Sequence, residues 1–361
     1  MRVKETIRKI TKMYLFLPIF SMLLVMTVNI IFDVVNGSAA FSFFTITIKN
    51  GVLYGRIIDI LNRGSEAAIL AIGMTFVISA SAGADISVGS VMSLAGGMCC
   101  MLLAGFGNAN VSSYAVPLVV GVLAGIAIAV LCGMFNGFLA SYLNIQPMVA
   151  TLILFSAGRA IGLLLCNNTI VYIREPSFQF FGGYLWIFPT PIITTVICIT
   201  VAMLVLRYTA LGMYIQSVGI NKNAARIAGY RSKRIMFTAF AISGLCAGIA
   251  GIQATSRIYS ADTNNIGLYL ELDAILAVAL GGNSLGGGKF RMPGSIIGAY
   301  TIQAITTTLY ALGVSSAQAP LYKAVIVILI VTIQSPAVKA FFAKRAAAKA
   351  ASAIRKGAVS L

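Results

Sequence analysis

Residues 206–234 read LRYTALGMYIQSVGINKNAARIAGYRSKR, a basic stretch between two long apolar runs. The stretch holds six of the 26 Lys and Arg residues of the chain and no Asp or Glu. Apolar runs of about 20 residues are long enough to cross a bilayer as helices. We therefore interpret residues 206–234 as a loop in water that joins two membrane spans, which makes the chain a polytopic membrane protein.

A short helix is expected inside this loop, where residues 219–229 read GINKNAARIAG. Asn221 is a suitable N-cap, the alanines favour helix, and Gly229 supplies a stop signal. Small residues on one face of such a helix would leave room for the surface of another protein. An ordinary basic cytoplasmic loop is the alternative interpretation.

The composition supports a membrane protein of the all-α class. Hydrophobic residues make up 59% of the 361 residues and charged residues only 10%, with a mean hydropathy of +0.95. Soluble domains carry about 25% charged residues. Residues 86–158 contain no charged residue, and this run is too long for a single span.

We predict about ten transmembrane helices, some of them short or broken, with both termini in the cytoplasm. Residues 1–12 would form a cytoplasmic N-terminus, 13–335 a transmembrane domain with the loop at 208–234, and 336–361 a basic cytoplasmic tail. Residues 55–62 have an amphipathic pattern, which predicts a helix that lies at the membrane interface and leads into the second span. The expected spans are residues 13–32, 67–80, 91–106, 117–142, 146–165, 191–206, 235–256, 270–280, 294–312 and 322–334.

The formal net charge of +17 would suit a nucleic-acid-binding protein, but its distribution along the chain indicates a membrane protein. The predicted topology places 19 of the Lys and Arg residues on one side, six on the other and Arg159 inside a span. Such an excess marks the cytoplasmic side of a membrane protein. The charge therefore sets the orientation, with contact to anionic lipid or an acidic partner surface as a secondary use, and nucleic acid is not an expected partner.

Two glycine-rich interruptions separate short apolar runs. Residues 81–90 read SAGADISVGS, and residues 281–291 read GGNSLGGGKFR. Broken helices are tolerated at membrane depth only where their backbone is buried in protein or lines a watery path. We therefore place residues 81–90 at or near a conduit.

Polar side chains in and around these spans are candidates for the lining of a conduit. Ionisable groups are costly at membrane depth and mark functional sites by default, while amides and hydroxyls can bind a polar solute. Structural pairing of the acids with Arg159 and hydrogen bonding between helices are the alternatives. The candidate pathway residues are Asp85, Ser87, Asn136, Gln146, Thr151, Glu271, Asp273 and Asn283.

No catalytic arrangement is evident, and we expect neither a metal site nor a cofactor bound by this chain. The sequence has no His, which excludes imidazole ligands and His-based acid–base catalysis. It also lacks the phosphate-binding motif G-x-x-x-x-G-K-[ST], so any energy from ATP must come from a partner. The six Cys residues form no C-x-x-C pair and are expected to be small core residues.

Several motifs together resemble the permease subunits of bacterial ABC importers for ribose and related sugars. The loop motif at 219–229 is followed by SGLCAGIAG at residues 243–251. The segments AIGMTFV and GADISVGS at 71–77 and 83–90, GMFNG at 133–137, and LDAILAVALGG at 272–282 are also similar to family motifs. Ala82 stands where the family usually has glycine. The segments at 58–63, 145–154 and 262–273 are most similar to the galactofuranose branch.

The resemblance implies that this chain is a non-enzymatic permease subunit that moves a monosaccharide across the bacterial inner membrane. It implies two permease subunits, a partner ATPase that binds ATP and Mg²⁺, and an external sugar-binding protein. The loop at 208–234 would be the coupling loop to the ATPase. The residues assigned to coupling are Gly219, Asn221, Ala224, Ala225, Arg226 and Gly229.

A transporter of another class remains an alternative. An ion- or proton-coupled secondary transporter of a small polar solute would use the acids Asp85, Glu271 and Asp273. It would need no ATPase and would respond to the membrane potential.

Overall fold

The computed structural model describes residues 15–35, 42–49 and 51–334. The chain divides into two compact units, Met1–Thr308 and Leu309–Leu361, and each is described by itself. The predicted cytoplasmic ends at 1–12 and 336–361, and the start of the first predicted span at 13–14, lie outside the described residues.

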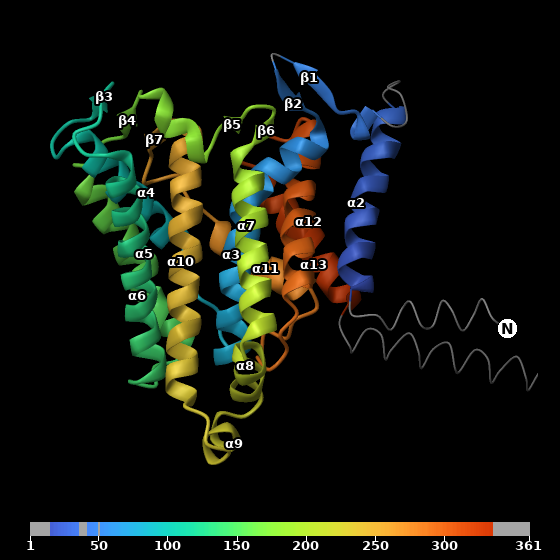
Figure 1. Ribbon diagram of the computed structural model, residues 1–361. Coiled ribbons are helices and arrows are strands. Elements are labelled where there is room, and N and C mark those ends of the chain that lie inside the picture. Colours follow the sequence, from blue (N-terminus) through green and yellow to red (C-terminus); the bar gives the residue numbers. More distant parts are fainter. Residues whose placement is uncertain (1–14, 36–41, 50, 335–361) are drawn as a thin grey trace, which may run out of the picture. The chain divides into compact units, whose positions relative to one another are not determined.

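The first unit is a bundle of helices capped by short strands (Figure 1). Helix α12 begins in this unit, and its last residues belong to the second unit, which also contains α13 (Ala319–Gln334). The helices in chain order are α2 (Phe16–Val35), α3 (Arg56–Ser81), α4 (Val88–Ala104), α5 (Leu118–Ser141), α6 (Pro147–Leu165), α7 (Thr190–Tyr208), α8 (Leu211–Ile220), α9 (Lys222–Ile227), α10 (Ser232–Ile258), α11 (Leu270–Leu280) and α12 (Met292–Ala311), with 3-10 turns η1 (Ser42–Phe44) and η2 (Pro176–Phe181).

Helix α3 forms the core of the first unit. Every residue from 67 to 80 is buried, and the helix packs against α7, α8, α10 and α11. This part of the sequence is uncharged and apolar on all sides, as expected of a helix enclosed by other helices. At Gly73 a Cβ atom would lie 2.8 Å from the Cα atom of Ser243, so the backbones of α3 and α10 meet closely.

Helices α5 and α10 also pack backbone to backbone. A Cβ atom at Gly133 would lie 2.9 Å from the Cα atom of Gly244. Small residues allow this approach, which maximises van der Waals contact where water supplies no driving force. The segment SGLCAGIAG at 243–251 therefore forms the packing seam of α10. All six Cys residues are unpaired, and five of them are buried, as the sequence predicted.

Short strands join the loops at the end of the first unit opposite α9 (Figure 1). Strand β4 (Val171–Ile173) pairs in parallel with β3 (Asn110–Val111) and antiparallel with β7 (Ser260–Ala261). The antiparallel pairs are β1 (Thr47–Lys49) with β2 (Val52–Tyr54), in the register Thr47↔Tyr54, and β5 (Tyr184–Leu185) with β6 (Phe188–Pro189), in the register Tyr184↔Pro189.

Each predicted span coincides with a helix, and the break at 81–90 is present between α3 and α4. Among the described residues, six helices are long and apolar enough to cross a membrane: α2, α3, α5, α6, α7 and α10. The polytopic helical class is thereby confirmed. That ten helices cross, and that both termini are cytoplasmic, stays a prediction.

The helix expected at 55–62 leads directly into the second predicted span, because residues 56–81 form the single helix α3. Charged side chains there have partners within the protein. Arg56 Nη1 lies 2.7 Å from Asp33 Oδ1, and Arg257 Nη1 lies 3.1 Å from Glu66 Oε1. Their pairing lets the helix run on directly into the buried core.

Candidate functional site

Helix α9 is a single exposed turn at one end of the first unit (Figure 1). As predicted, Asn221 caps it: Asn221 Oδ1 accepts hydrogen bonds of 3.0 Å from the backbone N–H groups of Asn223 and Ala224. Gly229 follows the helix with φ 87°, a left-handed conformation that glycine adopts without strain.

One face of α9 is buried against the protein and the other is exposed. Ala225 is buried, whereas Arg226 is exposed and Ile227 is 86% exposed. Ala224 is also exposed. An apolar side chain held out in this way, next to a cation and small residues, is suited to a contact with another protein.

Gly219 was predicted within the short helix but lies in the last turn of α8. A methyl group at Gly219 would overlap the backbone oxygen of Ser79 in α3. The same oxygen accepts a hydrogen bond of 3.1 Å from Gly288 N, and Ser79 Oγ donates to Lys289 O over 2.7 Å. Helix α8 therefore connects α9 rigidly to the end of α3 and to the glycine-rich segment 281–291.

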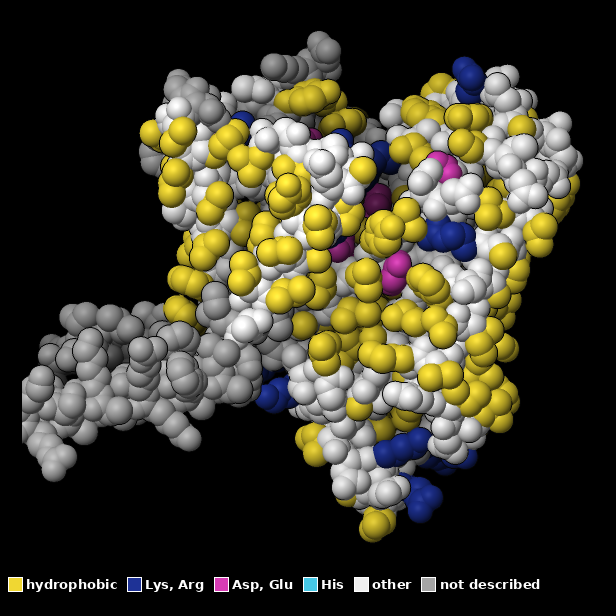
Figure 2. Space-filling model, turned by 180° about the vertical axis from the view of Figure 1, so that it is seen from behind, with side chains coloured by type: hydrophobic (Ala, Val, Ile, Leu, Met, Phe, Trp, Pro, Cys, Tyr) yellow, Lys and Arg dark blue, Asp and Glu magenta, His cyan; other side chains and the backbone are white. Residues whose placement is uncertain are grey.

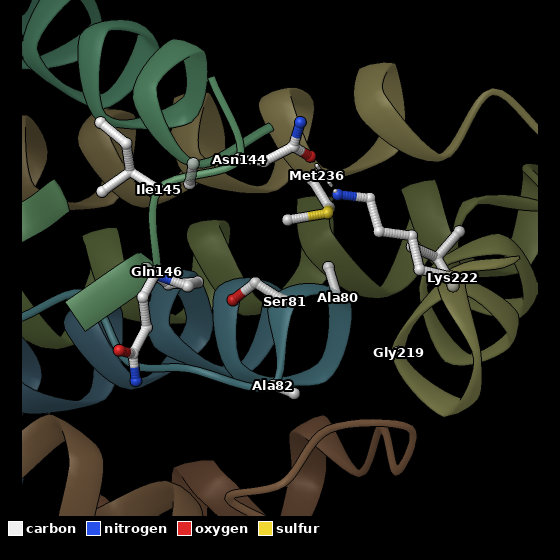
Figure 3. A pocket seen from close by; sticks show the side chains of 12 residues that line it. Ala80, Ser81, Ala82, Asn144, Ile145, Gln146, Gly219, Lys222 and Met236 are labelled. Atoms are coloured by element: carbon white, nitrogen blue, oxygen red, sulfur yellow. Dashed lines mark hydrogen bonds between the residues drawn. The ribbon is translucent and has the colours of Figure 1, made fainter. Parts of the chain in front are cut away.

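A cavity of about 320 Å³ lies beside this junction (Figure 3). Lys222 Nζ donates a hydrogen bond of 3.0 Å to Asn144 Oδ1 across its edge, which links the start of α9 to the connection between α5 and α6. Partial burial, with a smaller contribution from Lys233, lowers the pKa of the Lys222 ammonium group. The cavity is lined by Ala80, Ser81, Ala82, Ala140, Asn144, Ile145, Gln146, Pro147, Val218, Gly219, Lys222 and Met236.

A second cavity, of about 750 Å³, shares Asn144 and Lys222 with the first and has a cationic lining. Lys233 Nζ lies 5.8 Å from the centre of the Tyr142 ring, a cation–π contact at its wall. Figure 2 shows Lys and Arg side chains at the end of the first unit that carries α9. The cations that line the cavity are Lys222, Arg226, Arg231, Lys233 and Arg234, and no acid lines it.

The break between α3 and α4 is held by the buried Asp85. Its Oδ1 accepts hydrogen bonds from Ser87 N (3.0 Å) and Ser87 Oγ (2.6 Å), and its Oδ2 accepts one from Ser243 Oγ (3.1 Å). Asn136 Nδ2 donates to Ser87 Oγ over 2.8 Å. Asp85 thus joins the break to α10 directly and to α5 through Ser87.

The neighbouring Thr151 belongs to the same region. Its Oγ1 accepts a hydrogen bond of 3.2 Å from Ile86 N and donates one of 3.2 Å to Met148 O. Within the described part of the chain, Asn136 Oδ1 is buried and has no hydrogen-bond partner. Gln146 is exposed at the N-cap of α6 and lines the 320 Å³ cavity instead.

Arg159 holds the loop that precedes α11. Its Nη1 donates to the backbone oxygens of Thr263 (2.8 Å), Asn264 (2.7 Å) and Ile266 (3.2 Å). It also interacts electrostatically with Glu271, while its hydrogen bonds go to the loop carbonyls. The side chain therefore has a structural role in this loop.

Glu271 and Asp273 are buried in the first turn of α11. Glu271 packs against Gly89 of α4, where a side chain would overlap Glu271 Oε2. That oxygen has no hydrogen-bond partner among the described residues. Asp85 is the first residue of the segment 85–89, and Glu271 contacts its last residue, Gly89. The two acids therefore belong to separate polar clusters.

Asn283 belongs to the turn between α11 and α12. Its Oδ1 accepts a hydrogen bond of 2.6 Å from Arg291 N, and its Nδ2 donates to Ser295 Oγ over 2.8 Å. Thr75 Oγ1 of α3 also lies 2.8 Å from Ser295 Oγ. Asn283 therefore joins the glycine-rich turn to the start of α12, which Ser295 links to α3, and it lines neither cavity described above.

Two hydroxyl groups of these networks were not among the predicted site residues. Ser243 binds Asp85, and Ser79 joins α3 to the glycine-rich segment. Ser243 opens the SGLCAGIAG segment, which was noted only as a family motif. No sequence pattern distinguished Ser243, because Asp85 lies 158 positions away in the chain and only the fold brings the two side chains together.

Comparison with known proteins identifies the family. Residues 56–334 match the model of the branched-chain amino acid transport system / permease component. The galactofuranose transporter permease protein YtfT of Escherichia coli is 43% identical over 294 residues, 81% of this chain and 83% of the relative. The fructose import permease protein FruF of Bifidobacterium longum is 38% identical over 293 residues, 80% of each chain.

The ribose import permease protein RbsC of Escherichia coli is 34% identical over 299 residues, 81% of this chain and 87% of the relative. No solved structure matches the chain. The resemblance that the sequence motifs indicated is thereby confirmed. The chain belongs to the family of branched-chain amino acid transport system permease components.

Proposed function

We propose that this chain is the permease subunit of an ATP-driven ABC importer for a monosaccharide. The observation that carries the proposal is the match over 56–334 together with relatives named as galactofuranose, fructose and ribose permeases. Galactofuranose or a ribose-like sugar is the substrate we favour, because the galactofuranose permease shares 43% identity with this chain.

The exposed helix α9 is proposed as the contact with the ATP-binding subunit, which would bind ATP and Mg²⁺. This role is supported by the exposed Ile227 and Arg226 and by the cationic cavity beside them. An acidic partner surface would be attracted to five cations with no acid among them.

Movement of α9 would reach the core through α8. Gly219 lies against Ser79 at the end of α3, and three residues further on Ala82 opens the break that contains Asp85. Because close-packed backbones do not compress, a displacement of α8 must move the end of α3, the segment 281–291, or both. This contact is the proposed route from ATP hydrolysis to the break.

The remaining partners follow from the same assignment. A second permease subunit, identical or related, would complete the conduit, and an extracytoplasmic sugar-binding protein would dock at the end opposite α9. The α9 end would be cytoplasmic, in the inner membrane of a bacterium. Asp85, Ser87, Asn136, Thr151 and Glu271 are proposed to lie along or next to the sugar path.

Reconstituted transport tests the proposal. We expect sugar uptake into proteoliposomes only when the ATP-binding subunit, ATP and the external binding protein are all supplied. A catalytically inactive ATP-binding subunit is the matched control and should give no uptake. Uptake by this chain alone, driven by a pH gradient, would instead show a secondary transporter.

A further inference from the structure

The hairpin β5–β6 lies directly ahead of α7 (Figure 1). It exposes a cluster of large apolar side chains. Trp186 is 90% exposed and Phe188 is 60% exposed. Leu185 and Ile187 are also exposed. Such a patch on one short hairpin is unfavourable in water and indicates a surface that something apolar covers.

The hairpin is held in a fixed position. Thr190 N and Thr190 Oγ1 donate to Gly183 O over 2.9 and 3.0 Å, which closes its base at the first residue of α7. Leu53 N of β2 donates to Ile187 O over 3.2 Å. The side chains at its tip are therefore presented by an ordered element that is joined to its neighbours by backbone hydrogen bonds.

The tip also has a costly conformation. Trp186 has φ 57°, in the left-handed region that Asn or Gly occupies more readily in two-residue hairpin turns. A bulky residue is strained there, because its Cβ atom comes too close to the following carbonyl oxygen. The turn thus holds a large amphipathic ring outward although a smaller residue would form the same turn with less strain.

The length of α7 places this hairpin at the edge of the bilayer. Helix α7 has 19 apolar-rich residues, and its exposed side chains include Val196, Ile197 and Val201. At about 1.5 Å per residue it spans roughly the 30 Å of a hydrocarbon core. Its first residue, Thr190, then lies at one boundary of that core, and Trp186 lies just beyond it, at the depth where indole rings are favoured.

A hollow of about 380 Å³ links the hairpin to the side of α7, and it is lined by Leu185, Trp186, Phe188 and Ile193. All four lining side chains are apolar, and Ile193 belongs to the same helix as the exposed residues Val196, Ile197 and Val201. A contact with a soluble protein would carry a polar rim. The continuity with the side of α7 instead favours lipid.

We propose that the β5–β6 hairpin is a membrane anchor, with Trp186 inserted at the headgroup boundary of the leaflet opposite α9 and phospholipid chains covering the hollow. The proposal depends on the membrane-spanning role of α7 and does not depend on which solute is transported.

The chain itself supplies the probe, because Trp186 is its only tryptophan. The full-length chain would be placed in phosphatidylcholine liposomes that carry bromine either near the headgroup or near the end of the acyl chain. We expect bromolipid to quench the emission, more strongly from the shallow position than from the deep one, and aqueous iodide to quench it weakly.

Two reference variants calibrate depth in the same liposomes. Trp186→Phe combined with Val201→Trp places the ring in the middle of α7, where deep bromine should quench best. Trp186→Phe combined with Ile227→Trp places it on α9, where iodide should quench and bromolipid should not.

The proposal is overturned if native Trp186 behaves like the Ile227→Trp reference. It is equally overturned if bromolipid quenching appears only when the protein is diluted with excess lipid, because that would show a second copy covering the hairpin. A change of emission on adding a soluble binding protein, without bromolipid quenching, would assign the hairpin to that protein instead.

Discussion

Gly219 of α8 lies against the backbone oxygen of Ser79 in α3 with no room for a methyl group. Ser79 O also accepts the N–H of Gly288, so three segments of the chain meet at one carbonyl group. The contact connects α8, which leads into the exposed helix α9, with the end of the buried part of α3. Its substitution offers the most direct test of the proposed coupling route.

Gly219→Ala is expected to uncouple the transporter. Forcing a side chain into a packed contact costs about 1–3 kcal/mol and would push α8 away from α3. We expect sugar uptake per ATP hydrolysed to fall while α9 still binds the ATP-binding subunit. Gly286→Ala is the control, because a Cβ atom there meets only Ser284 Oγ at 3.6 Å. Equal uptake in both variants would contradict the route.

Arg226→Glu is expected to weaken association with the ATP-binding subunit. The change reverses one charge in a lining of five cations, and each 1.4 kcal/mol lost weakens binding about tenfold. Co-purification and titration with the ATP-binding subunit measure the effect. Arg174→Glu, at the opposite end of the first unit, should leave association unchanged. If the two variants bind equally well, α9 is not the contact.

Asn221→Ala is expected to loosen α9 without altering its exposed face. Losing an N-cap costs about 1 kcal/mol of helix stability. The amides of Asn223 and Ala224, which the Asn221 side chain now binds, should exchange hydrogen faster. Asn221→Asp keeps an acceptor and should restore protection, and Asn223→Ala should leave the cap intact. Unchanged exchange in Asn221→Ala would show that the cap contributes nothing in solution.

Substitutions of Asp85 separate a structural carboxylate from a proton carrier. Asp85→Ala would leave the Ser87 and Ser243 groups without their acceptor, which costs about 1–3 kcal/mol for a stranded buried group. Asp85→Asn keeps an oxygen for Ser87, and its amide can donate to the Ser243 hydroxyl. We therefore expect a lower thermal midpoint for the Ala variant, and near-normal ATP-dependent uptake for the Asn variant. Loss of all uptake in Asp85→Asn, with normal stability, would favour the proton-coupled alternative.

The helices and the break were predictable from the sequence because their signals are local. Apolar runs marked the spans, SAGADISVGS marked the break, and Asn221 with Gly229 marked the ends of α9. The lengths of α3 and α8 were harder to predict, because they depend on distant partners. Arg56 pairs with Asp33, and Glu66 pairs with Arg257, 191 positions apart in the sequence, so polar residues that suggested an interface continue a buried helix.

The candidate site could be predicted only in part, because its contacts also depend on residues that are distant in the sequence. Asp85, Ser87 and Asn136 were each named as candidate pathway residues, and the fold joins them in one hydrogen-bond network that the sequence did not predict. Ser243, however, had no signal that distinguished it from other small residues on α10, because only the folded packing brings its hydroxyl to the carboxylate. Structural pairing of Arg159 with the acids was one expected alternative. Arg159 does interact electrostatically with Glu271, but its hydrogen bonds go to backbone oxygens that no sequence pattern reveals.

The small sheet of β3, β4 and β7 has a mechanical consequence. Its strands follow α4, α6 and α10. The backbone hydrogen bonds from Ile173 N to Tyr259 O and from Arg174 N to Val111 O, both 2.8 Å, join the chain segments that leave these three helices. Helices that are joined by hydrogen bonds at one end can separate only at the opposite end. We therefore expect the joined end to serve as a pivot, with α4, α6 and α10 fanning apart toward the α9 end as the cycle proceeds.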